Sequence, residues 1–258
     1  MFHVDALTDK PFTGNPAAVC PLPRWLDDAW MQSVAAENNL SETAFFVPNG
    51  DIFELRWFTP RCEVKLCGHA TLASAWVLMQ ILAPERSFVR FETRFSGALT
   101  TYKEDNLIAM DFPALKPWLC PIPPPGLIQG LGKTPAQVMQ IEDNYFAVYE
   151  REEEVRSICP DFRLIEMLHP AGVGITAAGK NCDFVSRYFA PSYGVPEDPV
   201  TGSTHCSLAP YWAERLGKTN LHARQISERG GEIWCEVKER RVILKGSAVL
   251  TFRGELLI

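Results

Sequence analysis

Cys67-Gly68-His69-Ala70-Thr71-Leu72-Ala73-Ser74-Ala75-Trp76 is the stretch that decides the fold, because the chain contains a second version of it. The later version reads Gly202-Ser203-Thr204-His205-Cys206-Ser207-Leu208-Ala209-Pro210-Tyr211-Trp212. Each follows an arginine, two aromatic residues, a small residue and a proline, at Arg56-Trp57-Phe58-Thr59-Pro60 and Arg187-Tyr188-Phe189-Ala190-Pro191. A unit of strand, proline turn, loop and helix is therefore expected to occur twice.

The two versions of this unit are spaced differently. Arg187 follows Arg56 by 131 positions, whereas His205 follows His69 by 136 positions. The difference predicts five extra loop residues in the second version, in the loop that holds Pro196-Glu197-Asp198-Pro199. We therefore expect Asp198 to lie in an insertion that the first half lacks.

The composition is that of an ordinary globular protein. Of the 258 residues, 47% are hydrophobic and 22% are charged, and the net charge is −6. The chain shows no basic block, no signal-peptide pattern at Met1-Phe2-His3-Val4-Asp5 and no apolar run of the ~18 residues that a membrane span needs. We therefore expect a cytoplasmic protein that binds a small-molecule substrate and has neither nucleic acid nor membrane as a partner.

The cysteines indicate packing rather than metal binding. The chain has 8 of them, and none forms a Cys-x-x-Cys pair or a Cys/His cluster with zinc spacing. We expect reduced thiols, most of them buried, and no metal site.

The helix that begins at Gly68 and runs to about Leu82 is apolar on nearly every side, so it needs to be buried all round. A sheet that curls around it is the economical way to do so. The predicted fold is α+β, with two pseudo-symmetric lobes, each a strand barrel around a central helix. We expect an N-terminal lobe at 1–113, completed by a C-terminal strand at 246–258, and a C-terminal lobe at 118–245.

Several local signals mark the elements of these lobes. Pro113 to Pro125 is rich in proline and predicts a linker. Asp27 or Asp28 is expected to cap a helix, and Gly217 to end the second repeat helix. Thr134-Pro135 has the order of a helix cap followed by a first-turn proline, and predicts a helix after it.

Five positions are candidates for chemistry. Gly68 and Gly202 begin the repeat helices, where unpaired N–H groups and the helix dipole attract an anion, although glycine also permits tight packing. Glu42 precedes an apolar strand, where desolvation would raise its pKa toward that of a proton shuttle, unless it is a surface carboxylate. Asp198 is either a functional carboxylate or a turn aspartate, and His69 is either a functional or a core histidine.

Four segments resemble the PhzF, or phenazine biosynthesis-like, family. They cover nearly the whole chain in order: Asp5 to Val19 (Asp-Ala-Leu-Thr-Asp-Lys-Pro-Phe-Thr-Gly-Asn-Pro-Ala-Ala-Val), Glu37-Asn38-Asn39-Leu40-Ser41-Glu42-Thr43-Ala44-Phe45, Gly68-His69-Ala70-Thr71 and Glu197-Asp198-Pro199-Val200-Thr201-Gly202-Ser203-Thr204-His205. The family is similar in fold to diaminopimelate epimerase, which implies two lobes with the site in the cleft between them.

The resemblance also implies a reaction and its residues. It implies a cofactor-independent isomerase or epimerase that moves a proton between carbons of a small amino- or carboxylate-bearing metabolite. By motif match, the catalytic glutamate falls on Glu42, and the supporting histidine, aspartate and serine fall on His69, Asp198 and Ser203. Amides near Gly68 and Gly202 would hold a substrate carboxylate, and the family relative implies a homodimer.

Two alternatives remain open at this point. Diaminopimelate epimerase uses two cysteines, one before each helix, whereas this chain has Cys67 in the first of those positions and Thr201 in the second. Cys67 is therefore either a second base opposite Glu42 or a structural thiol. The protein could also be a non-catalytic metabolite-binding protein that keeps the cleft, in which case ligand binding would survive Glu42→Gln without turnover.

Overall fold

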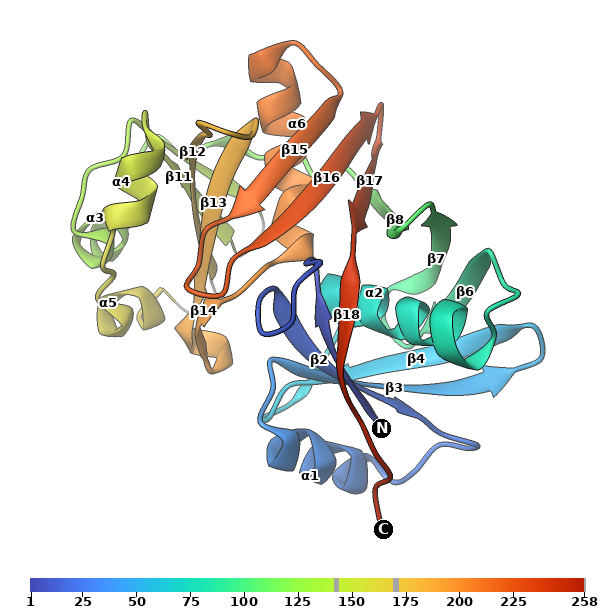
Figure 1. The fold of residues 1–258 in the computed structure, drawn as a ribbon. Helices are drawn as coiled ribbons and strands as arrows, with labels where there is room; N and C mark the ends of the chain where they lie inside the picture. Colours follow the sequence, from blue (N-terminus) through green and yellow to red (C-terminus); the bar gives the residue numbers. More distant parts are fainter. Residues whose placement is uncertain (142–143, 169–171, 258) are drawn as a thin grey trace. The chain divides into compact units, whose positions relative to one another are not determined.

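A computed structural model describes residues 1–141, 144–168 and 172–257 (Figure 1). The chain divides into two compact units. Unit 1 comprises Met1–Phe112 and Ile243–Ile258, and unit 2 comprises Pro113–Val242. Among the described residues, no helix combines the length and the apolar character that crossing a membrane requires.

Unit 1 consists mainly of strands. Its helical elements are α1 (Asp28–Asn38), α2 (Gly68–Val77) and the π-helical turn η1 (Leu78–Leu82). Its strands are β1 (Phe2–Ala6), β2 (Asn15–Pro21), β3 (Glu42–Asn49), β4 (Ile52–Phe58), β5 (Glu63–Val64), β6 (Phe88–Thr93), β7 (Gly97–Glu104), β8 (Leu107–Pro113) and β18 (Ala248–Arg253). The strand β17 (Arg241–Gly246) crosses from unit 2 into unit 1.

The strands of unit 1 surround α2 (Figure 1). They pair in the order β18, β1, β2, β3, β4, β6, β7 and β8, and β8 also pairs with β17, which leads into β18. Every residue of α2 except Trp76 is buried, and the helix packs against β1, β2, β3 and β18. An all-round apolar sequence therefore gives a helix buried on all sides, as the sequence predicted.

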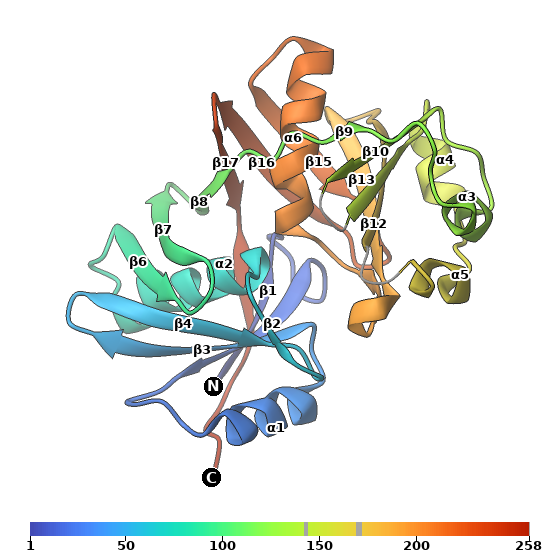
Figure 2. The same ribbon diagram turned by 180° about the vertical axis from the view of Figure 1, so that it is seen from behind.

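Unit 2 repeats this plan with more helical elements, namely α3 (Pro125–Leu131), α4 (Glu152–Ser157), α5 (Phe162–Glu166), the 3-10 turn η2 (Pro191–Tyr193) and α6 (Gly202–Leu216). Its strands are β9 (Trp118–Leu119), β10 (Gln137–Ile141), β11 (Asn144–Val148), β12 (Gly172–Ala178), β13 (Phe184–Ala190), β14 (Val195–Asp198), β15 (Asn220–Gln225) and β16 (Gly231–Lys238). Figure 2 shows α6 beside β15 and β16, against which it packs.

The pairing pattern is the same in both units. β11 and β12 run parallel, β12 and β13 antiparallel, and β13 and β15 parallel. In unit 1, β2 and β3 run parallel, β3 and β4 antiparallel, and β4 and β6 parallel. The duplication inferred from the sequence is therefore present in the strand topology, and the predicted α+β architecture is confirmed.

One predicted helix is wrong. The residues after Thr134-Pro135 form the strand β10, whose residues Gln137–Ile141 pair with β11. The helix lies earlier, where Pro125 occupies its first turn and Gly132 ends it in the left-handed conformation, with φ of 67°. The proline-rich segment thus contains β9 and the beginning of α3 as well as linker residues.

Candidate active site

The backbone at the start of α2 holds Cys67 in a fixed position. Cys67 is the N-cap residue, with extended backbone angles (φ −141°, ψ 111°). Its carbonyl accepts hydrogen bonds from the Thr71 hydroxyl at 2.5 Å and from the Thr71 amide at 3.2 Å. Gly68 and His69 follow as the first two residues of the helix, and both are buried.

His69 lies between a thiol and a carboxylate. Its Nδ1 is 3.5 Å from Cys67 Sγ, and its Nε2 is 3.2 Å from Glu42 Oε2. The ring is completely buried, and burial lowers the pKa of His69 to about 3. The imidazole is therefore neutral at neutral pH and carries one proton, which it can present to only one of its two neighbours.

Glu42 enters this group from the first position of β3. The strand is held between β2 and β4, where Glu42 is in register with Ala17 and the next residue, Thr43, with Phe58. Its side chain is 17% exposed, and Oε2 itself is buried. Glu42 is thus a carboxylate at the edge of the protein interior, next to a neutral imidazole.

A second group of polar side chains lies at the start of α6 in unit 2. Thr201, the N-cap residue, donates its hydroxyl proton to Asp198 Oδ2 at 2.5 Å. The Gln225 amide donates to the Asp198 carbonyl at 2.7 Å, and its Oε1 accepts from the Thr201 amide at 2.9 Å. Gly202 is buried, whereas Ser203 is exposed.

The structure corrects the predicted insertion around Asp198. In unit 1, Trp57 pairs with Val64, and in unit 2, Tyr188 pairs with Asp198. Asp198 therefore has a counterpart in Val64 and does not lie in an insertion. The extra residues of unit 2 lie before it, in the turn that contains η2.

The first residues of α2 and α6 show that His69 and His205 are not equivalent positions, contrary to the repeat read from the sequence. Because α2 begins at Gly68 and α6 at Gly202, His69 corresponds to Ser203 and not to His205. His205 takes the place of Thr71, since each side chain bonds the carbonyl of the N-cap residue four positions earlier. His205 Nδ1 donates to the Thr201 carbonyl at 2.8 Å.

Unit 2 has no carboxylate at the position equivalent to Glu42. Thr43 pairs with Phe58 and Val173 pairs with Phe189, so the residue equivalent to Glu42 is Gly172. A Cβ atom at Gly172 would overlap the Tyr188 hydroxyl. That hydroxyl donates to Asn144 Oδ1 at 2.7 Å, so a phenol fills the space where unit 1 has a carboxylate.

The two repeat arginines support these regions in the same way. Arg56 donates through Nε and Nη2 to the two carboxylate oxygens of Glu63, at 2.7 and 2.8 Å. Arg187 makes the same bidentate pair with Glu197, at 2.7 and 2.9 Å. These pairs tie β4 to β5 and β13 to β14, the strands that lead to the two helices.

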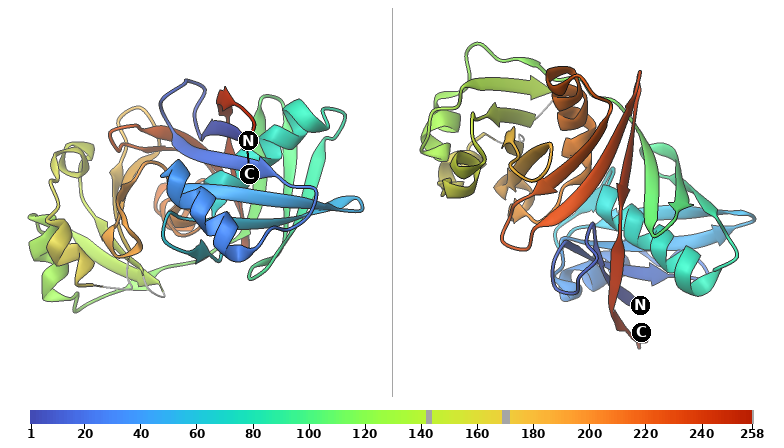
Figure 3. Two further views of the ribbon diagram at one scale, coloured as in Figure 1. Left: turned by 90° about the horizontal axis from the view of Figure 1, so that it is seen from below. Right: turned by 45° about the horizontal axis from the view of Figure 1, so that its top comes forward.

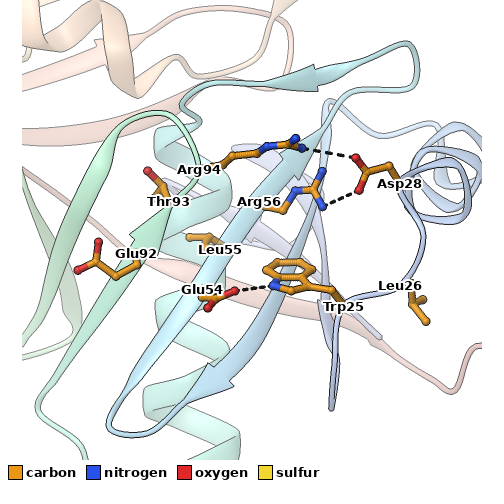
Figure 4. A pocket seen from close by; sticks show the side chains of 9 residues that line it. All are labelled: Trp25, Leu26, Asp28, Glu54, Leu55, Arg56, Glu92, Thr93 and Arg94. Atoms are coloured by element: carbon orange, nitrogen blue, oxygen red, sulfur yellow. Dashed lines mark hydrogen bonds and ion pairs between the residues drawn. The ribbon is translucent and has the colours of Figure 1, made fainter.

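A surface hollow of about 440 Å³ lies beside Arg56 in unit 1 (Figure 4). Its lining consists of Trp25, Leu26, Asp28, Glu54, Leu55, Arg56, Glu92, Thr93 and Arg94. Figure 4 shows Asp28 bonded to both arginines and the Trp25 indole donating to Glu54. Asp28 pairs with both Arg56 and Arg94, so we assign the hollow to the support of Arg56 and not to the Glu42 group.

Glu42, Cys67 and His69 are also a possible set of metal ligands, since each offers one ligand atom and these atoms lie within 4.8 Å of one another. The thiol and the carboxylate, however, face different nitrogens of one ring. Coordination of one metal ion by all three residues would therefore need one of these side chains to move.

The family model of the PhzC-PhzF, or phenazine biosynthesis-like, proteins matches residues 4–254. The chain belongs to this family. A relative from Pseudomonas aeruginosa, named an uncharacterized isomerase, is 51% identical over 256 residues, which cover 99% of this chain and 98% of the relative.

Solved structures agree with this assignment. The PhzF family protein of Enterococcus faecalis is 45% identical, with a TM-score of 0.95 over 100% of this chain and 98% of that one. A probable proline racemase from Agrobacterium radiobacter shares the fold alone, with 11% identity and a TM-score of 0.65 over 100% of this chain and 92% of that one. The epimerase-like fold expected from the PhzF resemblance is therefore confirmed.

The structure of this PhzF-family protein groups the predicted site residues by unit. Glu42 and His69 are in contact in unit 1, next to Gly68, and Cys67 joins them. Asp198, Gly202 and Ser203 lie near one another along the chain in unit 2, and Thr201 and Gln225 join Asp198. The sequence pattern did not indicate Gln225, because this residue is 24 positions from Thr201. Only the folding of β15 brings Gln225 into contact with Thr201.

Proposed function

We propose that this protein is a cofactor-independent isomerase or epimerase that moves a proton between carbons of a small amino- or carboxylate-bearing metabolite. Glu42 is the principal acid/base in this proposal. The names of relatives support the reaction class, since the Pseudomonas relative is named an isomerase and the relative from Halalkalibacterium halodurans, 45% identical over 262 residues, has the same name.

The observation that carries the proposal is the contact of Glu42 Oε2 with His69 Nε2 at 3.2 Å. The neutral imidazole packs against the carboxylate and limits its position without placing a positive charge beside it. Because the carboxylate is mostly shielded from water, it can hold a substrate proton long enough to return it. An exposed carboxylate would exchange that proton with water.

The start of α2 supplies a second element of the proposal. The amides of the first turn lack partners within the helix and lie at its positive end. They would stabilise a substrate carboxylate, or the enolate that forms when a neighbouring carbon loses its proton. Asp198, Gly202 and Ser203 enter the proposal through the family motif, and their roles have to be tested separately by Asp198→Asn and Ser203→Ala.

Deuterium exchange tests the proposal without knowledge of the substrate. A panel of amino acids and of amino- and hydroxycarboxylic acids is incubated with the protein in D₂O, and carbon-bound deuterium is measured by NMR. We expect exchange in at least one compound and a loss of about 10²- to 10⁴-fold in Glu42→Gln. The matched control is Glu37→Gln, which alters an exposed carboxylate of α1 and should exchange as wild type does.

Two results would contradict the proposal. Exchange in Glu42→Gln as fast as in wild type would remove Glu42 from the reaction. Thermal stabilisation by a panel compound that persists in Glu42→Gln, with no exchange in either protein, would instead identify a metabolite-binding protein. A cytoplasmic location and a homodimer remain predictions, the second of which sedimentation would test.

A further inference from the structure

We propose that Trp57 is a substrate-binding residue of the site around Glu42, and that its indole N–H donates a hydrogen bond to a carboxylate oxygen of the bound molecule. The proposal rests on the proposed function for its use in a reaction, but the binding itself can be tested without turnover. It adds to the site a residue that the sequence pattern marked only as part of the repeat.

Trp57 is a buried hydrogen-bond donor whose N–H has no acceptor. Its side chain is 1% exposed, and an indole ring can donate through Nε1 but cannot accept there. Among the residues that the structure describes, none accepts a hydrogen bond from Trp57 Nε1. A buried donor without an acceptor costs stability and is rare in native proteins. An acceptor that comes with a ligand would remove this cost.

The strand register places Trp57 next to Glu42. Ala44 lies directly opposite Trp57 in the antiparallel pair of β3 and β4. Opposite residues of such a pair share a face of the sheet, and so do alternate residues of one strand. Glu42, two positions before Ala44, is therefore the diagonal neighbour of Trp57 on the same face, at the separation of about 7–8 Å that aromatic side chains can span.

Unit 2 shows how far an aromatic side chain reaches from this position. Tyr188 is the equivalent of Trp57, and its hydroxyl lies where a Cβ atom of Gly172, the equivalent of Glu42, would be. That hydroxyl donates to Asn144 Oδ1 at 2.7 Å. The polar group of the aromatic ring thus has a partner inside unit 2, whereas the indole N–H of Trp57 has none among the described residues of unit 1.

The surroundings of Trp57 favour a carboxylate as the ligand group. On its other side, Trp57 pairs with Val64 of β5, and this strand leads to the first turn of α2 at Gly68. The amides of that turn are donors, and they lie at the positive end of the helix. A group bound between these amides and the indole has to accept hydrogen bonds and is favoured when it is negative, which describes a carboxylate and excludes an ammonium group.

A carboxylate bound in this way would position the substrate for Glu42. The carbon next to the carboxylate would face the Glu42 side chain, and the same donors would stabilise the enolate that forms when this carbon loses its proton. An indole N–H does not give up its proton to a carboxylate, so Trp57 would bind and orient without competing in proton transfer.

The test follows the indole N–H signals of the wild-type protein by NMR, with ¹⁵N in its 7 tryptophans. The protein is titrated with sodium formate, the smallest carboxylate, and in parallel with sodium chloride at equal ionic strength. We expect formate to move the indole proton signal of Trp57 downfield to saturation, and chloride to leave it in place. Each signal is assigned through the other resonances of its own residue, so the titration needs no variant.

Trp212 provides the internal control. It is also buried, but its Nε1 already donates to Thr176 Oγ1 at 2.9 Å, so its signal should not move. A Trp57 signal that formate does not move would overturn the proposal. Equal shifts of Trp57 and Trp212, or equal shifts with formate and chloride, would overturn it as well, because neither result requires a carboxylate at the indole.

Trp57→Phe provides a second measurement, because it removes the N–H and keeps an apolar ring. For a compound that wild type exchanges in D₂O, we expect the KM to rise about tenfold while kcat changes much less. Trp212→Phe is the matched control, since it removes a buried indole from unit 2, and its KM should equal that of wild type. A Trp57→Phe protein with lower kcat or stability but an unchanged KM would show that Trp57 only packs.

The titration and the exchange experiment separate this proposal from the proposed function. A formate-dependent shift of Trp57 without deuterium exchange in any compound would support the carboxylate-binding role and contradict the isomerase. Exchange that requires Glu42, with a Trp57 signal that formate does not move, would support the isomerase and remove Trp57 from the binding of its substrate.

Discussion

The first residues of α2 and α6 share a backbone and differ in chemistry. Both helices follow an extended N-cap residue, Cys67 or Thr201, and then begin with glycine. In unit 1 the N-cap thiol contacts the His69 ring, whereas in unit 2 the N-cap hydroxyl is bonded to Asp198 and Gln225. The comparison teaches that the duplicated scaffold fixes where the side chains lie, while single substitutions decide what they contact.

Removing one repeat arginine should have the largest effect on this shared scaffold. Arg187 is 12% exposed, pairs with Glu197 and also donates to the carbonyls of Val155 and Ile158, at 3.2 and 2.7 Å. Arg187→Ala leaves a shielded carboxylate and these carbonyls without their donor. We expect a loss of about 3–5 kcal/mol in the unfolding free energy of unit 2, measured by hydrogen exchange.

The control for this variant is Arg90→Ala. Arg90 is half exposed and pairs with Glu92 on the surface of β6, so its loss should cost about 0–1 kcal/mol. Equal losses in the two variants would mean that the bidentate pair is not what holds β13 and β14 together.

Gly172→Ala tests why unit 2 has no counterpart of Glu42. The added Cβ would overlap the Tyr188 hydroxyl, so we expect a loss of about 1–3 kcal/mol in denaturant unfolding. Gly126→Ala is the matched control, because its Cβ would meet only ordinary contacts at 3.7 Å. If Gly172→Ala were as stable as the control, tight packing would not explain the missing carboxylate.

The pH dependence of stability tests the different role of the second histidine. Burial lowers the pKa of His205 to about 4, although its bond to the Thr201 carbonyl acts in the opposite direction. Between its unfolded value near 6.5 and 4, the unfolded chain therefore binds one more proton than the folded chain, so stability falls as pH falls through this window. At pH 5 this amounts to about 2 kcal/mol.

His205→Gln should flatten this dependence by one proton, and urea unfolding from about pH 7 to 4.5 would measure it. An unchanged slope would show that His205 takes up its proton in the folded state at an ordinary pKa. The lowered pKa would then distinguish His69 in unit 1 from His205 in unit 2.

Local signals in the sequence predicted much of the scaffold. Asp27 accepts from the amide of Ala29 at the start of α1, and Gly217 ends α6 with φ of 66°. These predictions succeed because a cap depends on its own side chain and the next few residues. The helix predicted after Pro135 is wrong because a first-turn proline also occurs at Pro125, and the strand pairing of β10 with β11 decides between the two positions.

The site was predictable only in part for the same reason. The family motif pointed to Glu42 and His69, and the structure shows them in contact. The true equivalence of His69 and Ser203 was hidden, because His-x-x-Leu-Ala-x-x-Trp recurs two positions out of register with the helix starts. Register is set by strand pairing across tens of residues, which no local pattern records.

Unit 1 is built from two segments that are far apart in the chain. β1 pairs with β18, and the backbones of Met1 and Gly254 exchange two hydrogen bonds, so the two ends of the described chain lie side by side (Figure 3). During synthesis on a ribosome, residues 1–112 emerge first but lack β18 until the end, whereas unit 2 is continuous. The proposed proton-transfer residues therefore belong to the part that matures last, and a stalled or truncated chain would present unit 2 folded and the Glu42 group unassembled.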